Sequence, residues 1–249
     1  PIHKAAALRA GLMFRNEVKR PDDNETCDAW LQRLGQTNTI RSVFWEPLIW
    51  AVLNDDPLVC SAAMLMAVIE RAFLGTRDGS RLGMPIVPLS KLYVAQATSF
   101  IREHGGEVHF GSPVRKLCIT NHRVSGFTLK SGETVDCPSV ITTVPPHALR
   151  ELLPEALLSH PVFHDIGRLR TSPIVNIWAL VDRSPFPGRP FVGLVHSPLH
   201  WLFDRSHIEG QQGGDILLNA TISGARAFME DAATSLQQLL IDELARFFP

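Results

Sequence analysis

Two histidine pairs have the four-residue spacing that could place metal ligands on one face of a helix: His160 with His164, and His196 with His200. A proline follows the first histidine of one pair, and another proline lies between the histidines of the second, so neither pair fits an uninterrupted helix. Neither pair has a third ligand at a suitable distance, which a metal centre would need. We therefore expect loop histidines that are bonded locally or to water, and no metal site.

Side chains for nucleophilic or acid–base chemistry are few. A serine nucleophile would stand in a Gly-x-Ser-x-Gly turn, which the sequence lacks. Cys137 precedes a proline at the edge of an expected strand and should pack as a small apolar residue. Glu46 lies between Trp45 and Trp50, where a carboxylate in an apolar pocket could be a functional acid. An exposed glutamate on a helix is the simpler interpretation.

Composition excludes several classes of protein. Of the 249 residues, 45% are apolar and 20% are charged, which excludes a disordered chain, a collagen and a coiled coil. The net charge of −1 leaves no footprint for general nucleic-acid binding. Four cysteines without a C-x-x-C pair predict free thiols in a reducing compartment. Neither a G-x-G-x-x-G fingerprint nor a P-loop occurs, so the usual nucleotide-binding signatures are missing.

Helices are expected in the first part of the chain. Residues 1–80 read as helical, with Thr26 as the N-cap of one helix and a second helix beginning near Thr37. Pro47 should kink or break the second helix. A third helix over 61–73 is apolar nearly all round and should be well buried.

The rest of the chain mixes both kinds of element. Residues 81–147 predict a helix over 89–104 and short strands at 107–110, 114–120, 123–130, 134–136 and 139–144. Residues 148–249 predict strands at 174–181, 191–195, 200–204 and 216–222, and an amphipathic helix over 234–248. This order indicates a mixed α/β or α+β fold.

One long segment resembles a known superfamily. It runs through H-G-G-E-V-H-F-G-S-P-V-R-K-L, the hairpin R-V-S-G-F-T-L-K-S-G-E-T and V-I-T-T-V-P-P-H-A-L. This order resembles the middle part of flavin-dependent amine oxidases and of carotenoid or phytoene desaturases. The resemblance implies that the backbone of Val114 meets the adenine of FAD. It also implies that the strand end formed by Thr142, Thr143, Val144 and Pro145 lies near the dinucleotide.

Shorter motifs resemble one branch of that superfamily. D-A-W-L-Q-R-L-G-Q, F-W-E-P-L, A-V-L-N-D-D-P, P-L-S-K-L and W-L-F-D-R look like the squalene-associated FAD-dependent desaturases, the hydroxysqualene dehydroxylases of hopanoid synthesis. The resemblance implies reductive conversion of hydroxysqualene to squalene, with reduced FAD as electron donor. Three alternatives stay open: a phytoene-type desaturase, an amine oxidase, and a non-catalytic lipid-binding remnant. A tyrosine cage for an amine is disfavoured because Tyr93 is the only tyrosine in the sequence.

The resemblance also implies a domain plan, that of a central fragment of a two-domain fold. Residues 1–80 would be the helical part of a substrate domain, 81–147 part of a discontinuous FAD-binding domain, and 148–249 the antiparallel sheet and helix of the substrate domain. The family's Rossmann fingerprint and its C-terminal Gly-Asp segment are absent from this sequence. We therefore expect this chain alone to hold FAD weakly and to be inactive.

The implied substrate is a long apolar polyprenoid, which needs a long apolar cavity. Five aromatic residues are candidates to line it, although filling the core is the simpler role for most of them: Trp45, Trp50, Trp178, Trp201 and Phe203. Glu46 is the candidate acid that would protonate the leaving hydroxyl. The uncharged run 57–69 is too short to span a bilayer. We expect a cytoplasmic protein, with contact to the inner face of the membrane as an open alternative. The sequence does not predict an oligomeric state.

Overall fold

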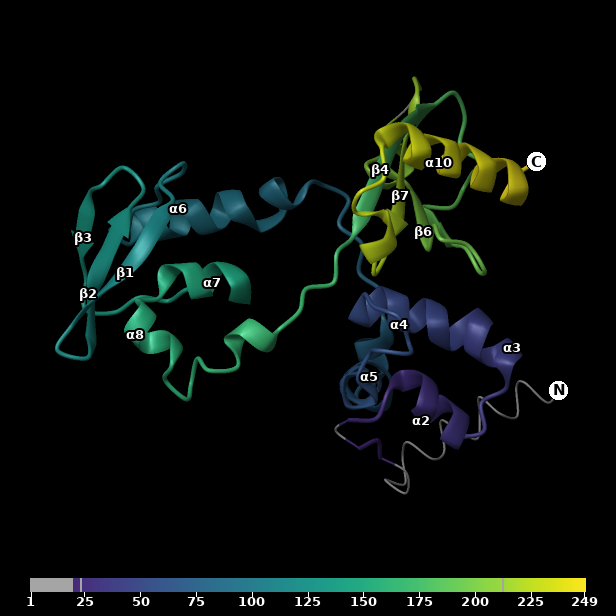
Figure 1. Ribbon diagram of the computed structural model, residues 1–249. Helices are drawn as coiled ribbons and strands as arrows, with labels where there is room; N and C mark the ends of the chain where they lie inside the picture. Colours follow the sequence, from purple (N-terminus) through teal and green to yellow (C-terminus); the bar gives the residue numbers. More distant parts are fainter. Residues whose placement is uncertain (1–19, 23, 212) are drawn as a thin grey trace. The chain divides into compact units, whose positions relative to one another are not determined.

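The structure, a computed structural model, describes residues 20–22, 24–211 and 213–249. The described residues form two compact units, one containing those up to Pro88 together with those of Ser172–Pro249, and the other Leu89–Thr171 (Figure 1). The expected boundaries lay after residues 80 and 147. The compact units therefore differ from the expected domains over 81–88 and 148–171, and the division into FAD-binding and substrate domains stays a prediction. Residues 1–19 of the expected helical part lie outside the described residues.

The first unit contains a small group of helices. They are α2 (Cys27–Arg33), α3 (Asn38–Ile40), the π-helix η1 (Arg41–Trp45), α4 (Glu46–Leu53), α5 (Ala62–Ile69), the π-helix η2 (Glu70–Leu74) and the 3-10 helix η3 (Arg77–Ser80). The Thr26 hydroxyl accepts a hydrogen bond from the Ala29 amide at 3.3 Å, which confirms the expected N-cap of α2. The core of these helices includes Trp30, Leu31, Ile49 and Leu65, each at most 1% exposed.

Pro47 does not end the second helix, which was expected to be kinked or broken there. η1 leads directly into α4, and the amide of Glu46 donates to the carbonyl of Arg41, five residues earlier. In an ordinary α-helix the proline ring would clash with the carbonyl four residues before it. The wider π-turn relieves that clash, so the chain stays helical from Asn38 to Leu53.

α5 and η2 are buried on one side only. Leu65 and Ile69 are 0% and 2% exposed, whereas Met64 is 60% and Phe73 51% exposed. The expectation that this helix is well buried therefore holds for one face only, because the other face is open. Among the described residues, no helix combines the length and the apolar character that crossing a bilayer requires.

The same unit contains an antiparallel sheet of four strands in the order β4-β7-β6-β5. Its elements are β4 (Val175–Val181), β5 (Phe191–Gly193), β6 (Trp201–Asp204), α9 (Arg205–Ile208), β7 (Ile216–Ile222), η6 (Arg226–Phe228) and α10 (Ala233–Phe247). α10 covers one face of the sheet, and Leu240 from this helix packs with Leu202, Leu218 and Ala220 from the strands (Figure 1). The predicted strands and amphipathic helix of this part are thus confirmed to within a few residues.

Polar contacts join the helices of this unit to its sheet. Asn54 ends α4 in the left-handed conformation, with φ of 56°. Its side chain donates to the Ser172 carbonyl at 2.9 Å and accepts from the Gly224 amide at 3.1 Å. Arg226 forms two hydrogen bonds to the Asp55 carboxylate, at 2.5 and 2.7 Å. Residues separated by more than 100 positions in the sequence are therefore held at one junction.

The second unit contains the three-stranded antiparallel sheet β1-β2-β3. Its elements are η4 (Ser90–Val94), α6 (Ala95–Glu103), β1 (Val114–Thr120), β2 (Arg123–Leu129), β3 (Thr134–Asp136), α7 (Pro146–Leu152), α8 (Glu155–Leu158) and η5 (Ile166–Arg168). The predicted hairpin is confirmed, and Asn121 and His122 form its turn with φ of 52° and 61°. Positive φ at both central residues is the requirement of a type I′ turn. α7 contacts β1.

Two predicted strands are not formed in this unit. Segments 107–110 and 139–144 have no regular secondary structure, and Phe110 and Ile141 are 74% and 93% exposed. Their composition favours strands, but a strand is stable only when its backbone groups pair with a neighbour. Within the described part of the chain no strand pairs with either segment, so both predictions are wrong for this structure.

Candidate functional site

The face of the four-stranded sheet opposite α10 carries side chains in rows set by the strand register. Two rows cross three strands on this face: Trp201–Thr221–Asn176 and Phe203–Asn219–Trp178. Successive side chains of a strand point to opposite faces, so the residues between them, such as Leu202 and Ala220, lie in the core with no exposed surface. The open face therefore presents aromatic rings beside hydroxyl and amide groups.

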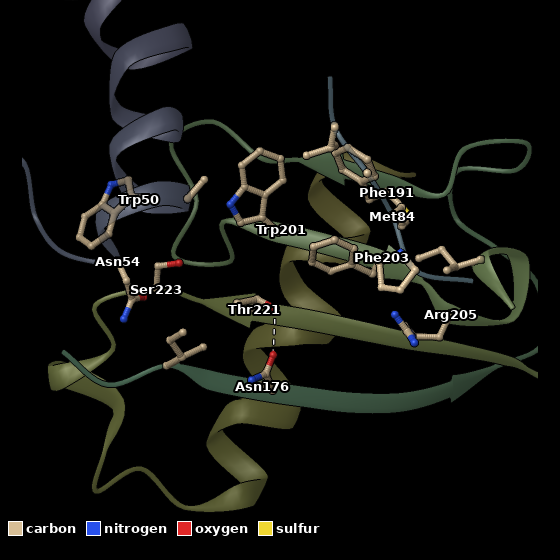
Figure 2. A pocket seen from close by; sticks show the side chains of 16 residues that line it. Trp50, Asn54, Met84, Asn176, Phe191, Trp201, Phe203, Arg205, Thr221 and Ser223 are labelled. Atoms are coloured by element: carbon tan, nitrogen blue, oxygen red, sulfur yellow. Dashed lines mark hydrogen bonds between the residues drawn. The ribbon is translucent and has the colours of Figure 1, made fainter. Parts of the chain in front are cut away.

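A cavity of about 510 Å³ lies over this face (Figure 2). Apolar side chains and short backbone segments form most of its wall: Trp50, Ala51, Leu82, Gly83, Met84, Pro85, Ile174, Phe191, Trp201, Phe203 and Ile208. Five polar residues complete the lining: Asn54, Asn176, Arg205, Thr221 and Ser223. This combination of an apolar wall and few polar groups is typical of a small-molecule site.

A hydrogen-bonded group of three residues lies at the floor of the cavity. The Thr221 hydroxyl donates to Asn176 Oδ1 at 2.9 Å, as Figure 2 shows, and lies 3.3 Å from Asn219 Oδ1. Asn219 is 7% exposed, and its Nδ2 donates to Asn176 Oδ1 at 3.3 Å. These contacts turn the Asn176 carbonyl oxygen toward β7 and leave its amide nitrogen outside the network.

Arg205 supplies a positive charge to the cavity lining. It is the first residue of α9, directly after β6, and Asp204 caps that helix by accepting from the His207 amide at 2.8 Å. The Arg205 guanidinium donates to Glu209 at 2.7 Å, within the same helix. Its position is therefore held by a partner that is not part of the cavity lining.

His200 lies behind the wall formed by Trp50. The two rings stack with their centroids 4.5 Å apart and their planes 18° from parallel. Burial lowers the pKa of His200 from 6.5 to about 4, so the ring is neutral at pH 7. Its Nδ1 accepts a hydrogen bond from the Ser223 amide at 3.0 Å, which leaves the proton on Nε2.

The family follows from a comparison with known protein families. A family model described as flavin containing amine oxidoreductase matches residues 4–249. The chain belongs to this family. The match covers both compact units and agrees with the superfamily resemblance seen in the sequence.

Individual relatives in and around this family are distant. The chain is 25% identical over 268 residues to a 15-cis-phytoene desaturase of Glycine max, an alignment covering 98% of this chain and 44% of the relative. It is 29% identical over 164 residues to a hydroxysqualene dehydroxylase of Rhodopseudomonas palustris, covering 63% of this chain and 36% of the relative. The chain thus spans less than half the length of either relative.

A solved structure has the same fold. An oxidoreductase from Methanosarcina mazei superposes with a TM-score of 0.77 at 17% identity, covering 98% of this chain and 58% of that one. At this identity the likeness concerns the fold, and it agrees with the predicted mixed α/β architecture containing antiparallel sheets.

The structure brings together three of the five aromatic residues predicted to line a substrate cavity. Trp50, Trp201 and Phe203 line the cavity over the sheet, while its use by a substrate stays a prediction. Trp178 lies in the same row as Phe203 on the open face and is 57% exposed, but it is outside the lining. Trp45 needs correction: it is 4% exposed in the helical core, where its indole donates to Gln36 Oε1 at 2.9 Å.

Glu46 lies at a different cavity from these aromatic residues. That cavity is more polar, and its lining is Asn38, Thr39, Arg41, Ser42, Val43, Glu46 and His196. Glu46 and Trp50 are neighbours one turn apart on α4, yet only Trp50 lines the apolar cavity. The prediction that Glu46 is a general acid therefore has no geometric support at the sheet face and stays a prediction.

The residues predicted to contact FAD all belong to the second unit. Val114 begins β1 and pairs with Leu129. Thr142, Thr143 and Val144 are exposed and lie outside regular secondary structure. Pro145 is the N-cap of α7, which contacts β1. Among the described residues, segment 139–144 makes no backbone hydrogen bond, so its amide and carbonyl groups are open to a polar ligand.

The other histidines and cysteines considered for chemistry lie outside the lining of the apolar cavity. Among the described residues, no three metal-binding side chains cluster together. His164 Nδ1 lies 3.1 Å from the Asp165 carboxylate at an exposed turn. Cys137 is a half-buried free thiol. Burial raises the pKa of Cys27 to about 12 and that of Cys60 to about 11, which makes these thiols poor nucleophiles.

Sequence reasoning missed the polar residues of the cavity. Asn176 is the one polar residue of the strand V-N-I-W-A-L-V, and Asn219 and Thr221 are the two polar residues of I-L-L-N-A-T-I. A polar residue in such a strand is a signal that could have marked them. Their pairing could not be read, because the two residues are 45 positions apart and meet only through the register of β4 with β7.

Proposed function

We propose that this chain supplies the substrate-binding sheet and part of the flavin-binding region of an FAD-dependent oxidoreductase that converts hydroxysqualene to squalene. The observation that carries the proposal is the cavity over the sheet, whose aromatic wall suits a long hydrocarbon and whose floor offers hydrogen bonds to one oxygen. The dehydroxylase relatives, 28% and 29% identical, support the same reaction.

We assign part of the dinucleotide-binding site to residues of the second unit. The open backbone groups of Thr142, Thr143 and Val144, beside Val114 and Pro145, would hold FAD through main-chain hydrogen bonds. When bound and reduced, the flavin supplies the hydride that replaces the hydroxyl group on carbon. The chain's own residues would bind the hydrocarbon, orient its hydroxyl group and keep water away from the reacting carbon. The hydroxyl group departs as water after taking up one proton.

Phytoene-type desaturation is the second candidate. It is supported by the phytoene desaturase relative, whose alignment covers 98% of this chain. A hydrocarbon substrate has no oxygen, so it would leave the polar floor of the cavity without a partner. Amine oxidation is disfavoured, because Arg205 lines the cavity and no carboxylate is found among its described lining residues.

The test uses the full-length protein, purified with its flavin. Reduced enzyme is incubated without oxygen with hydroxysqualene, and oxidised enzyme with phytoene or a primary amine, and the products are separated by chromatography. Squalene as the only product supports the proposal, whereas a desaturated polyene or an aldehyde would overturn it. A full-length protein that contains no flavin would support the lipid-binding remnant instead.

Two tryptophan variants connect the activity to the cavity. Trp201→Ala removes part of the cavity wall and should raise KM for hydroxysqualene. Trp178→Ala is the matched control, because Trp178 lies on the same open face but outside the lining. Equal effects of the two variants would place the substrate elsewhere.

A further inference from the structure

Asn176 has unused hydrogen-bond donors at the floor of the cavity. Its Oδ1 already accepts from the Thr221 hydroxyl and from Asn219 Nδ2. Among the described residues, no acceptor is within hydrogen-bond distance of its Nδ2, which carries two N–H groups. Flipping the Asn176 amide alone would place its NH₂ against the NH₂ of Asn219, which disfavours that flip.

Thr221 offers the complementary function. Its hydroxyl hydrogen is directed to the neighbouring amide oxygens, at 2.9 Å for Asn176 and 3.3 Å for Asn219. The Thr221 oxygen therefore keeps a lone pair that can accept a hydrogen bond. Both residues line the cavity, and they are direct partners across β4 and β7. Asn176 is exposed and Thr221 is half-buried, so a donor and an acceptor are held side by side on the open face of the sheet, among the apolar side chains of the cavity.

We infer that Asn176 and Thr221 form the subsite for the hydroxyl group of an alcohol substrate. An alcohol both accepts and donates one hydrogen bond, so it would accept from Asn176 Nδ2 and donate to Thr221 Oγ1. A hydrocarbon can satisfy neither group, and the subsite therefore selects an alcohol over a hydrocarbon of the same length. This inference rests on the proposed function and names the residues that position its substrate.

Other polar groups of the cavity are less suited to this role. The Asn54 side chain is engaged on both sides, by Ser172 and by Gly224. Arg205 is already paired with Glu209 and would attract an anion rather than a neutral alcohol. The Asn176–Thr221 pair is the arrangement that matches a neutral hydroxyl group.

The experiment measures binding to the full-length protein without turnover. Quenching of tryptophan fluorescence is titrated with a long-chain polyprenyl alcohol and with the hydrocarbon of the same chain length. The variants are Asn176→Leu and Thr221→Val, which remove the donor and the acceptor. Thr134→Val is the matched control, since Thr134 is also a strand threonine bonded to a neighbouring hydroxyl, that of Thr128 at 3.4 Å, but it lies in the other unit.

The inference predicts that each variant weakens alcohol binding by about 3- to 10-fold and leaves hydrocarbon binding unchanged. Equal loss for both ligands, or no loss for the alcohol, would overturn it. Thr134→Val should alter neither ligand. Binding is measured without catalysis, so the two proposals can fail separately. If the variants lose only alcohol binding but the wild-type protein forms no squalene, the proposed reaction is rejected and the subsite is kept.

Discussion

The indole of Trp50 stacks on the imidazole of His200, with centroids 4.5 Å apart. Trp50 belongs to α4 and lines the cavity, whereas His200 directly precedes β6 and is held by the Ser223 amide. The stack therefore joins a helix to the sheet at the edge of the proposed substrate site. This arrangement depends on a neutral imidazole, because a proton on His200 Nδ1 would point at the Ser223 N–H that now donates to that nitrogen.

We predict that stability falls as pH is lowered from about 6.5 to about 4. Burial lowers the pKa of His200 to about 4, against 6.5 when unfolded, so only the unfolded chain binds this proton in that window. The free energy of unfolding of wild-type protein and His200→Gln is measured from pH 7.5 to 4. The variant should show a smaller decrease, and the exposed-site control His164→Gln should follow wild type. Identical pH dependence for all three would contradict this account.

Gly224→Ala should destabilise the junction between helix and sheet. Gly224 has φ of +58°, and an added Cβ would lie 2.4 Å from the Trp50 ring and 3.3 Å from the Asp55 Cα. The combined strain and clash should cost about 2 kcal/mol or more of the free energy of unfolding, measured by chemical denaturation.

Gly188→Ala separates these two causes. Gly188 has φ of +77° but no heavy atom within 4 Å of an added Cβ, so only the backbone strain of about 1 kcal/mol should appear. Equal losses at the two glycines would show that the contact with Trp50 is unimportant.

Trp45 and Trp201 should respond differently to truncation. Trp45→Ala removes a side chain that is 4% exposed in the helical core and should cost about 3–5 kcal/mol of stability. Trp201→Ala should cost less stability but should weaken ligand binding, because its ring faces the cavity. Thermal unfolding and ligand titration of both variants check this contrast. Weaker ligand binding in Trp45→Ala than in Trp201→Ala would show that the ligand does not bind in the cavity over the sheet.

Glu46→Gln tests the acid suggested by the sequence. Since Glu46 lines the polar cavity and not the apolar one, we predict that kcat of the full-length enzyme stays within about twofold of wild type, the range of a surface change. Flavin content is measured alongside. A tenfold or greater loss of turnover with unchanged flavin content would restore Glu46 as the proton donor.

Local features of this fold could be predicted from the sequence, whereas features created by distant pairing could not. The cap at Thr26 and the Asn121–His122 turn depend on a few neighbouring residues, and both form as predicted. Segments 107–110 and 139–144 have the composition of strands, but strand formation also needs a partner that composition does not reveal.

The candidate site shows the same division. Trp45 and Trp50 look equivalent in the sequence, but five residues of helix turn them to different sides, so one enters the core and the other the cavity. Asn176 and Thr221 are marked singly only as polar residues in largely apolar strands, and they form the proposed subsite only because β4 pairs with β7. The aromatic residues of the cavity could therefore be predicted from the sequence, whereas its polar residues could not.

The most direct test of the central claim is a single-turnover reaction of the full-length flavoprotein. The bound flavin is reduced in the absence of oxygen, mixed with hydroxysqualene, and followed by its absorbance while squalene is quantified. The account predicts one squalene formed for each flavin oxidised, with slower oxidation in Asn176→Leu. Flavin that stays reduced in the presence of the alcohol, with no squalene formed, would contradict it.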